Sequence, residues 1–294
     1  MNPKKIKGTG VALVTPFHKD GSIDFSSLKK LVNHTIKGGV EYLVVLGTTG
    51  ESVTISRDEK TAILDLVCDV NEKRVPIVLG VGGNNTQEIL NQFDFFDFAN
   101  VDAILSVSPY YSKPSQRGII QHFKTVANAS PVPVILYNVP ARTGSNMLPE
   151  TTLALANEIE NIIGIKEASG NMEQCMSIIN GKPKDFLVIS GDDSITLPLM
   201  ACGADGVISV IANAYPKTFS EMVRLCMSNE FDKARALHYS FSEIIPLLFS
   251  EGNPPGIKYV LSQKEICQDY FRLPVVPVSK TLQNKLQEAM KRVK

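Results

Sequence analysis

One lysine of the chain stands at the end of an apolar run that has the composition of a buried strand. The run occupies 161–166 with the sequence NIIGIK, and Lys166 closes it. Burial disfavours the charged form of a lysine, and a neutral amine can attack a carbonyl carbon to form a Schiff base. The alternative is a structural lysine whose charged end reaches water at the rim of the fold. The other lysines occupy helical, terminal or loop contexts, where we expect water to reach them.

A tyrosine and an arginine follow the apolar run that precedes this one. Tyr137 lies at the same depth in its strand as Lys166 does in its own, and a phenol there can move protons on and off a carbinolamine. Arg142 comes five residues later in a loop, and its planar fork can hold a carboxylate by two parallel hydrogen bonds. The alternatives are that Tyr137 is a core residue whose hydroxyl has a hydrogen-bond partner and that Arg142 is an ordinary surface residue.

Two further strand ends carry hydroxyl and carboxylate side chains. Thr48 and Thr49 lie between glycines in GTTGES (47–52), which either forms a turn or lets backbone N–H groups approach a small anion. Asp192 and Asp193 are adjacent carboxylates, a weak signal for Mg²⁺, and we expect them to support a helix N-terminus instead. With only four histidines and no HxxxH or Cys/His set, the sequence predicts no metal centre.

These residues need a scaffold that gathers the ends of several strands. Eight β-branched, continuous apolar runs recur at intervals of roughly 30 residues, the size of a βα unit. Eight such units favour a closed (β/α)8 TIM barrel over a doubly wound sheet, and its catalytic groups come from the C-terminal ends of the strands. The runs are 10–17, 42–47, 76–82, 102–111, 132–140, 162–169, 186–193 and 206–214.

Amphipathic helical patterns separate the apolar runs, for example at 25–39 and 115–130. The helix expected over 56–73 begins with Ser56 as N-cap and Glu59 at its third position, which is a capping box. From Phe231 onward the pattern is helical throughout, with a turn at 252–256. We therefore predict a catalytic barrel over 1–230 and a C-terminal helical extension over 231–294.

The composition excludes several classes of protein. Hydrophobic residues make up 44% and charged residues 20% of the 294, and the net charge is zero, with no basic block for nucleic acid or an anionic membrane. The N-terminus has no apolar segment of a secretory signal. Five scattered cysteines without CxxC spacing predict reduced thiols in a cytoplasmic protein.

Four motifs stand in order at the expected strand ends: GTTGES, SPYYSKPSQRGIIQHF, YNVPARTG and GIKEASG. With them the chain resembles, over essentially its whole length, the pyruvate-dependent class I aldolase/lyase superfamily and within it the dihydrodipicolinate synthase family. The resemblance implies a lyase of diaminopimelate and lysine biosynthesis that condenses pyruvate with L-aspartate 4-semialdehyde.

The resemblance also implies a role for each residue of the site. Lys166 would form the Schiff base with pyruvate, and Arg142 would bind the carboxylate of the aldehyde substrate. Tyr137, Thr48 and Tyr111 would relay protons, with Tyr111 reaching in from a neighbouring subunit. The contacts to pyruvate would be completed by Thr49, Gly191 and the backbone near Ile208.

No metal or organic cofactor is implied, because the iminium itself is the electron sink. The family implies self-association as a homodimer or homotetramer. N-acetylneuraminate lyases and other keto-acid aldolases share the lysine and the tyrosine, but they typically lack Arg142 and the pair Tyr110–Tyr111. A catalytically silent barrel that binds a keto acid is the alternative from another class, and the presence of every reactive side chain argues against it.

Relatives in this family can be inhibited by lysine at a subunit interface. The sequence departs at Arg57 and Lys60, where sensitive bacterial members often carry histidines. Two additional cations repel a lysine ammonium, so we expect weak or altered feedback. Glu167 receives no chemical role from the sequence. The matching positions of the allosteric lysine site are Ser52, Asn84, Glu88 and Tyr110.

Overall fold

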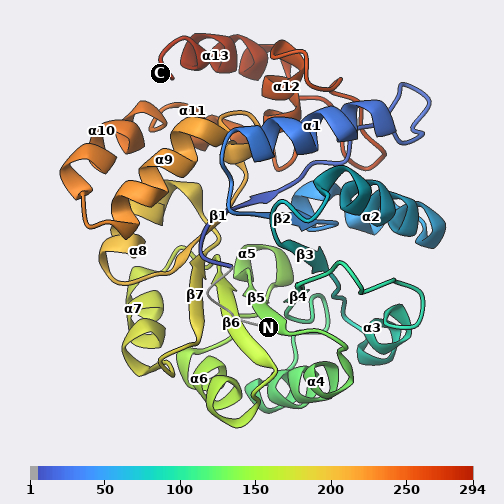
Figure 1. The fold of residues 1–294 in the computed structure, drawn as a ribbon, viewed down its shortest axis with the longest axis vertical. Helices are drawn as coiled ribbons and strands as arrows, with labels where there is room; N and C mark the ends of the chain where they lie inside the picture. Colours follow the sequence, from blue (N-terminus) through green and yellow to red (C-terminus); the bar gives the residue numbers. More distant parts are fainter. Residues whose placement is uncertain (1–5, 294) are drawn as a thin grey trace.

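A closed barrel of eight parallel strands forms the centre of the molecule, as predicted. The computed structural model describes residues 6–293, and in it each strand pairs with the next along the chain while β8 returns to β1. Figure 1 shows the helices surrounding this ring of strands. The strands are β1 (Gly8–Ala12), β2 (Tyr42–Val45), β3 (Ile77–Gly80), β4 (Ala103–Val107), β5 (Val134–Asn138), β6 (Ile162–Glu167), β7 (Leu187–Ser190) and β8 (Gly206–Ser209).

The helices fill the connections between strands. The capping box of α2 is confirmed: Ser56 Oγ accepts from Glu59 N–H, and the Glu59 carboxylate accepts from Ser56 N–H. The α-helices are α1 (Phe25–Lys37), α2 (Arg57–Asn71), α3 (Thr86–Gln92), α4 (Gln116–Ala129), α5 (Pro140–Thr143), α6 (Pro149–Glu158), α7 (Met172–Gly181), α8 (Thr196–Ala201), α9 (Pro216–Met227), α10 (Phe231–Ser240), α11 (Ile244–Phe249), α12 (Pro255–Gln263) and α13 (Lys280–Met290). Short 3₁₀ helices are η2 (Thr48–Gly50), η3 (Ser52–Thr54), η4 (Asp193–Ile195) and η5 (Ile211–Asn213).

The alternation of strand side chains divides the apolar residues into two cores. One core lies between the barrel and its helices, and the other fills the inside of the barrel. Tyr42 is the largest fully buried member of the inner core, and Gly10 on the adjacent strand leaves room for its ring. A Cβ at position 10 would collide with that ring. Gly10 therefore allows the Tyr42 side chain to fill the interior of the barrel.

The C-terminal extension packs along one side of the barrel, where Figure 1 shows α10 beside α9, and α11, α12 and α13 pack against one another. The expectation of helix throughout this part is wrong for 264–279, which is largely irregular. Pro274 and Pro277 lack the N–H that a helix interior needs. Arg272 anchors this segment, since its guanidinium donates to the backbone oxygens of Gly21 and Thr54 and to the Glu59 carboxylate.

All five cysteines are free thiols. Across residues 6–293, no helix is long and apolar enough to cross a membrane.

Candidate active site

Lys166 lies inside the catalytic end of the barrel. It pairs with Tyr137 of β5 and Ile189 of β7, so all three side chains point to the same face, the barrel interior. The lysine is 7% exposed, and its Nζ lies 4.3 Å from the centroid of the Tyr137 ring. In the described part of the chain, no carboxylate forms an ion pair with it. The predicted matching depth of the two residues on adjacent strands is confirmed.

Gly191 is required where β7 ends beside this lysine. Its N–H donates to the Glu167 carbonyl at 2.8 Å, and a Cβ here would lie 3.0 Å from Lys166 Cε and closer still to Ala168 Cβ. A side chain at position 191 would therefore displace the amine.

A cavity of about 280 Å³ opens beside these residues and brings together three of the predicted side chains. Thr48 enters it from η2, Tyr137 from β5 and Arg142 from α5. Arg142 is exposed and makes no ion pair with any described residue, which leaves its guanidinium available to an anion. The cavity therefore offers a phenol, a hydroxyl and a free cation next to a buried amine. Its lining also includes Ser52, Val53, Lys60, Gln92 and Tyr110.

The C-terminal extension forms hydrogen bonds with the loop after β2, and the sequence did not predict this contact. Thr49 is 3% exposed, and its Oγ1 accepts a hydrogen bond of 2.9 Å from Asn253 Nδ2. Glu51 adopts a left-handed conformation at φ 54°, and its Oε1 accepts from Lys258 Nζ at 2.5 Å. No local pattern marks these partners, which lie more than 200 residues away.

Lys258 contradicts the expectation that water reaches every lysine except Lys166. It has no exposed surface, and its Nζ lies 4.3 Å from the centroid of the Phe17 ring while donating to Glu51 and to the Tyr270 carbonyl. Burial lowers the pKa of Lys258, and the Glu51 carboxylate opposes that shift. The helical pattern around Lys258 suggested exposure, but α12 is buried on nearly every side.

Glu167 points away from the barrel interior and has a structural role. Its carboxylate accepts from Asn138 Nδ2 at 3.0 Å and 3.1 Å, from Gln174 Nε2 at 2.9 Å and from Ser169 N–H at 2.8 Å. These bonds join the ends of β5 and β6 to α7. Because Asn138 and Glu167 follow Tyr137 and Lys166 in the same strands, the network holds Tyr137 and Lys166 in register.

The predicted helix N-terminal role is confirmed for both aspartates after β7, Asp192 at η4 and Asp193 at η5. Asp192 is the N-cap of η4 and accepts from Ser194 N–H. Asp193 is buried and accepts from the N–H groups of Val210 and Ile211, beyond β8. Burial raises the pKa of Asp193 to about 6. Residues 6–293 contain no group of side chains suited to a metal ion.

The remaining predicted residues fall in different surroundings. Ile208 is buried in the inner core of the barrel. Tyr111 is 89% exposed at φ 70° and does not line the cavity of its own chain. Asn84 and Glu88 are exposed at the start of α3, outside the cavity that Ser52 and Tyr110 line.

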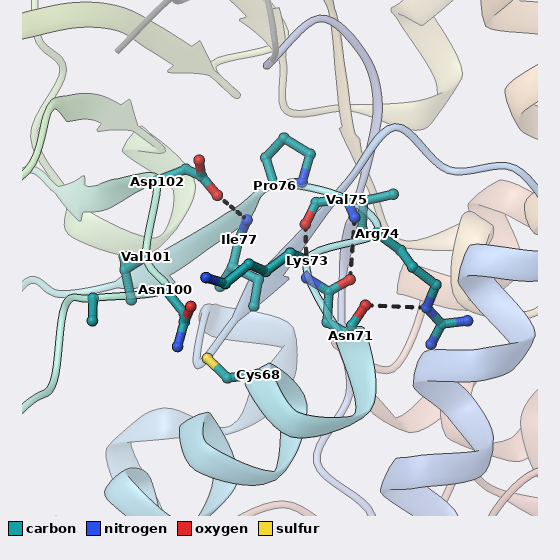
Figure 2. A pocket seen from close by; sticks show the side chains of 11 residues that line it. Cys68, Asn71, Lys73, Arg74, Val75, Pro76, Ile77, Asn100, Val101 and Asp102 are labelled. Carbon is teal, nitrogen blue, oxygen red and sulfur yellow. Dashed lines mark hydrogen bonds between the residues drawn. The ribbon is translucent and has the colours of Figure 1, made fainter.

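A larger cavity, of about 480 Å³, lies at the opposite end of the barrel, before β3 and β4 (Figure 2). Several of its polar groups bond to one another: Asn71 exchanges two hydrogen bonds with the backbone of Val75, and Asp102 accepts from Ile77 N–H. These bonds hold the loops that lead into the strands, and the catalytic end of a barrel is the other one.

A barrel whose mouth holds a buried, unpaired amine beside a phenol and a free arginine is the architecture of a (β/α)8 enzyme. The chain matches the dihydrodipicolinate synthetase family over residues 5–293. It belongs to that family of lyases.

Relatives and solved structures agree with this membership. The 4-hydroxy-tetrahydrodipicolinate synthase of Flavobacterium psychrophilum is 57% identical over 279 residues, 95% of each chain. That of Parabacteroides distasonis is 51% identical over 288 residues, 98% of this chain and 97% of the relative. The dihydrodipicolinate synthase of Acinetobacter baumannii, complexed with pyruvate, superposes with a TM-score of 0.95 at 39% identity, over 98% of this chain and 99% of that one. The enzyme of Cyanidioschyzon merolae with lysine bound gives 0.94 at 33% identity, over 98% of both chains.

Proposed function

We propose that this chain is a 4-hydroxy-tetrahydrodipicolinate synthase, which condenses pyruvate with L-aspartate 4-semialdehyde on the route to diaminopimelate and lysine. The Lys166 amine carries the proposal, because it is buried, unpaired among the described residues and 4.3 Å from the Tyr137 ring. The names of the relatives and the pyruvate bound to the Acinetobacter baumannii enzyme support the same substrate.

The reaction begins when Lys166 Nζ attacks C2 of pyruvate, and loss of water from the carbinolamine leaves an iminium ion. Tyr137, Thr48 and Tyr111 of a neighbouring subunit move the protons of this step. Loss of a proton from C3 gives an enamine, whose C3 attacks the aldehyde carbon. The amino group of the second substrate then attacks the iminium carbon, closes the ring and releases Lys166. The iminium accepts the electron pair, so these steps need no metal ion or organic cofactor.

Arg142 selects this second substrate over the acylated sugar that an N-acetylneuraminate lyase would use. Its guanidinium is exposed at the cavity and free of ion pairs with described residues, which suits a bidentate contact with a carboxylate. Thr49, Gly191 and the backbone near Ile208 complete the surroundings of the pyruvate carboxylate.

Two experiments test the proposal. Borohydride reduction in the presence of pyruvate, followed by mass spectrometry, should locate a stable adduct on Lys166, and its absence would rule out the Schiff base. Turnover of pyruvate with L-aspartate 4-semialdehyde should exceed turnover with N-acetylmannosamine, and the reverse preference would favour the sialic acid lyase.

Arg142→Ala should strongly reduce turnover with L-aspartate 4-semialdehyde while leaving formation of the pyruvate adduct largely intact. A charged hydrogen-bonding partner contributes about 1.5–3 kcal/mol, which predicts a loss of about tenfold to 100-fold in kcat/KM for the aldehyde. Arg235→Ala, on the exposed face of α10, is the matched control and should change neither quantity. Equal loss of condensation and of adduct formation would contradict the assigned role.

The proposed assembly is at least a homodimer, and a homotetramer fits the family. Tyr111 is 89% exposed and outside the cavity of its own chain, as expected of a residue that serves a neighbouring site. The free thiols fit the reducing cytoplasm, where we place the protein.

Inhibition by lysine is expected to be weak or altered. Lys60 lines the cavity near Ser52 and Tyr110, and burial lowers its pKa, while the Arg57 guanidinium lies 4.4 Å from the centroid of the Phe95 ring. Lysine titration of the steady-state assay measures the effect, and replacing both cations by histidine should strengthen inhibition. Strong inhibition of the unmodified enzyme would contradict this expectation.

A further inference from the structure

The turn between α11 and α12 reaches the catalytic end of the barrel. Asn253 lies in this turn, which the sequence marks only as a break between helices, and its Nδ2 donates to Thr49 Oγ1 at 2.9 Å. Thr49 is the residue to which the pyruvate carboxylate is assigned under the proposed function, on which this inference rests. A residue of the C-terminal extension is therefore one hydrogen bond away from the substrate.

The direction of this bond decides what the Thr49 hydroxyl can do. A hydroxyl has a single hydrogen, and Thr49 Oγ1 uses a lone pair to accept from Asn253. Within residues 6–293, the hydroxyl donates to no other group, so its hydrogen remains available to a substrate oxygen. An anionic acceptor such as a carboxylate makes the strongest use of such a donor.

The position of the Asn253 amide group lowers the stability of the fold. Its Oδ1 is buried and has no partner among the described residues. A buried polar atom without a partner destabilises the fold, so its retention beside Thr49 calls for a reason other than stability.

The contact between Asn253 and Thr49 is supported by a second interaction between the same two segments, the loop after β2 and the start of α12. Lys258 of α12 forms a buried ion pair with Glu51, whose Oε1 lies 2.5 Å from its Nζ. Glu51 directly follows η2, and Lys258 lies in α12, five residues after Asn253. The hydrogen bond and the ion pair together fix the position of α12 relative to Thr48 and Thr49.

We propose that Asn253 is a positioning residue that holds the Thr49 hydroxyl with its hydrogen directed at the carboxylate of pyruvate. The C-terminal extension thereby completes the substrate site of the barrel. Asn253 acts through Thr49, so its loss should weaken pyruvate binding without affecting the aldehyde substrate.

Asn253→Asp and Asn253→Ala distinguish this role from packing. An aspartate carboxylate only accepts, so it takes the Thr49 hydrogen and places a negative charge near the substrate carboxylate. We expect the KM for pyruvate to rise about tenfold or more, with kcat and the KM for L-aspartate 4-semialdehyde little changed. Asn253→Ala removes the donor without taking the hydrogen and should have a smaller effect in the same direction. A packing role predicts the reverse order, because Asp keeps the shape of Asn whereas Ala leaves a cavity.

Asn71→Asp is the matched control at the opposite end of the barrel (Figure 2). Asn71 is buried, and its Nδ2 donates to the Val75 carbonyl at 2.7 Å. Its substitution should lower the melting temperature and leave the KM for pyruvate unchanged.

The outcomes separate this inference from the function on which it rests. An unmodified enzyme that forms no borohydride-trapped adduct on Lys166 refutes the proposed function. An enzyme that forms the adduct, with Asn253→Ala more harmful than Asn253→Asp, overturns the positioning role alone. If the Asp variant is not recovered folded, an unchanged KM for pyruvate in Asn253→Ala overturns it equally.

Discussion

Two lysines, Lys166 and Lys258, are buried near the catalytic end of the barrel, and their surroundings differ. Lys166 is 7% exposed and lies beside the Tyr137 ring, which lines the cavity, and it has no carboxylate partner among the described residues. Lys258 has no exposed surface and donates to Glu51 and to the Tyr270 carbonyl. One nitrogen is available to a substrate, and the other is enclosed.

The difference teaches that burial alone does not identify a reactive lysine. A neighbouring carboxylate favours the ammonium form, whose nitrogen has no lone pair for attack on a carbonyl. The Glu51 carboxylate therefore keeps Lys258 structural, although Lys258 is the more deeply buried of the two. What marks Lys166 among the described residues is the combination of burial, a neighbouring cavity and the absence of a carboxylate partner.

Lys166→Met should produce the largest effect on activity. Loss of the amine removes the nucleophile, so turnover should fall by several orders of magnitude and the borohydride-trapped pyruvate adduct should disappear. The melting temperature should stay the same or rise, because methionine has a similar length and removes a largely buried charge that has no carboxylate partner among the described residues. An adduct that persists on Lys258 in this variant would overturn the contrast between the two lysines.

Lys258→Met should act on stability instead. It leaves the Glu51 carboxylate buried without a partner, which costs about 3–5 kcal/mol in the free energy of unfolding measured by urea denaturation. Adding Glu51→Gln should recover a large part of that loss, because a neutral amide is less costly to bury. The folded fraction should still form the adduct on Lys166. Unchanged stability of the single variant would show that the ion pair contributes little.

The ion pair between Glu59 and Arg272 is a weaker counterpart of the pair between Glu51 and Lys258. It also joins the extension to the barrel, but it is partly exposed. The Arg272 guanidinium lowers the pKa of Glu59 to about 2 from its ordinary 4.5. A lowered folded-state pKa means that the stabilisation is present above about pH 4.5 and is lost as the pH falls toward 2. Solvent screening limits the effect to about 0.5–1 kcal/mol.

The measurement is the free energy of unfolding between pH 5 and pH 2.5 for the unmodified protein and for Arg272→Gln. The difference between the two proteins should shrink across this window, because protonation of Glu59 removes the interaction that the variant lacks. A constant difference would show that the ion pair contributes nothing and that Arg272 acts through its backbone contacts to Gly21 and Thr54.

Much of the barrel and of its site could be predicted from local patterns. Strands covered on both sides are continuous apolar runs, so all eight were found in order, and the polar residues near the ends of several runs could be assigned to the barrel mouth. Lys166, Tyr137 and Arg142 were found in this way. The irregular segment 264–279 was missed, because the prolines within it were outweighed by the helical patterns on either side.

The amino-acid sequence by itself determined which side chains are candidates for chemistry and at which strand ends they stand, since both follow from residue type and from periodicity along a few residues. Only the tertiary structure decided which of them have partners. Asn253 meets Thr49 across 204 positions and Lys258 meets Glu51 across 207, and no periodic pattern spans such intervals. The physical reason is that a partner is defined by proximity after folding, so the same residue type, lysine, has no carboxylate partner in β6 and a buried ion pair in α12.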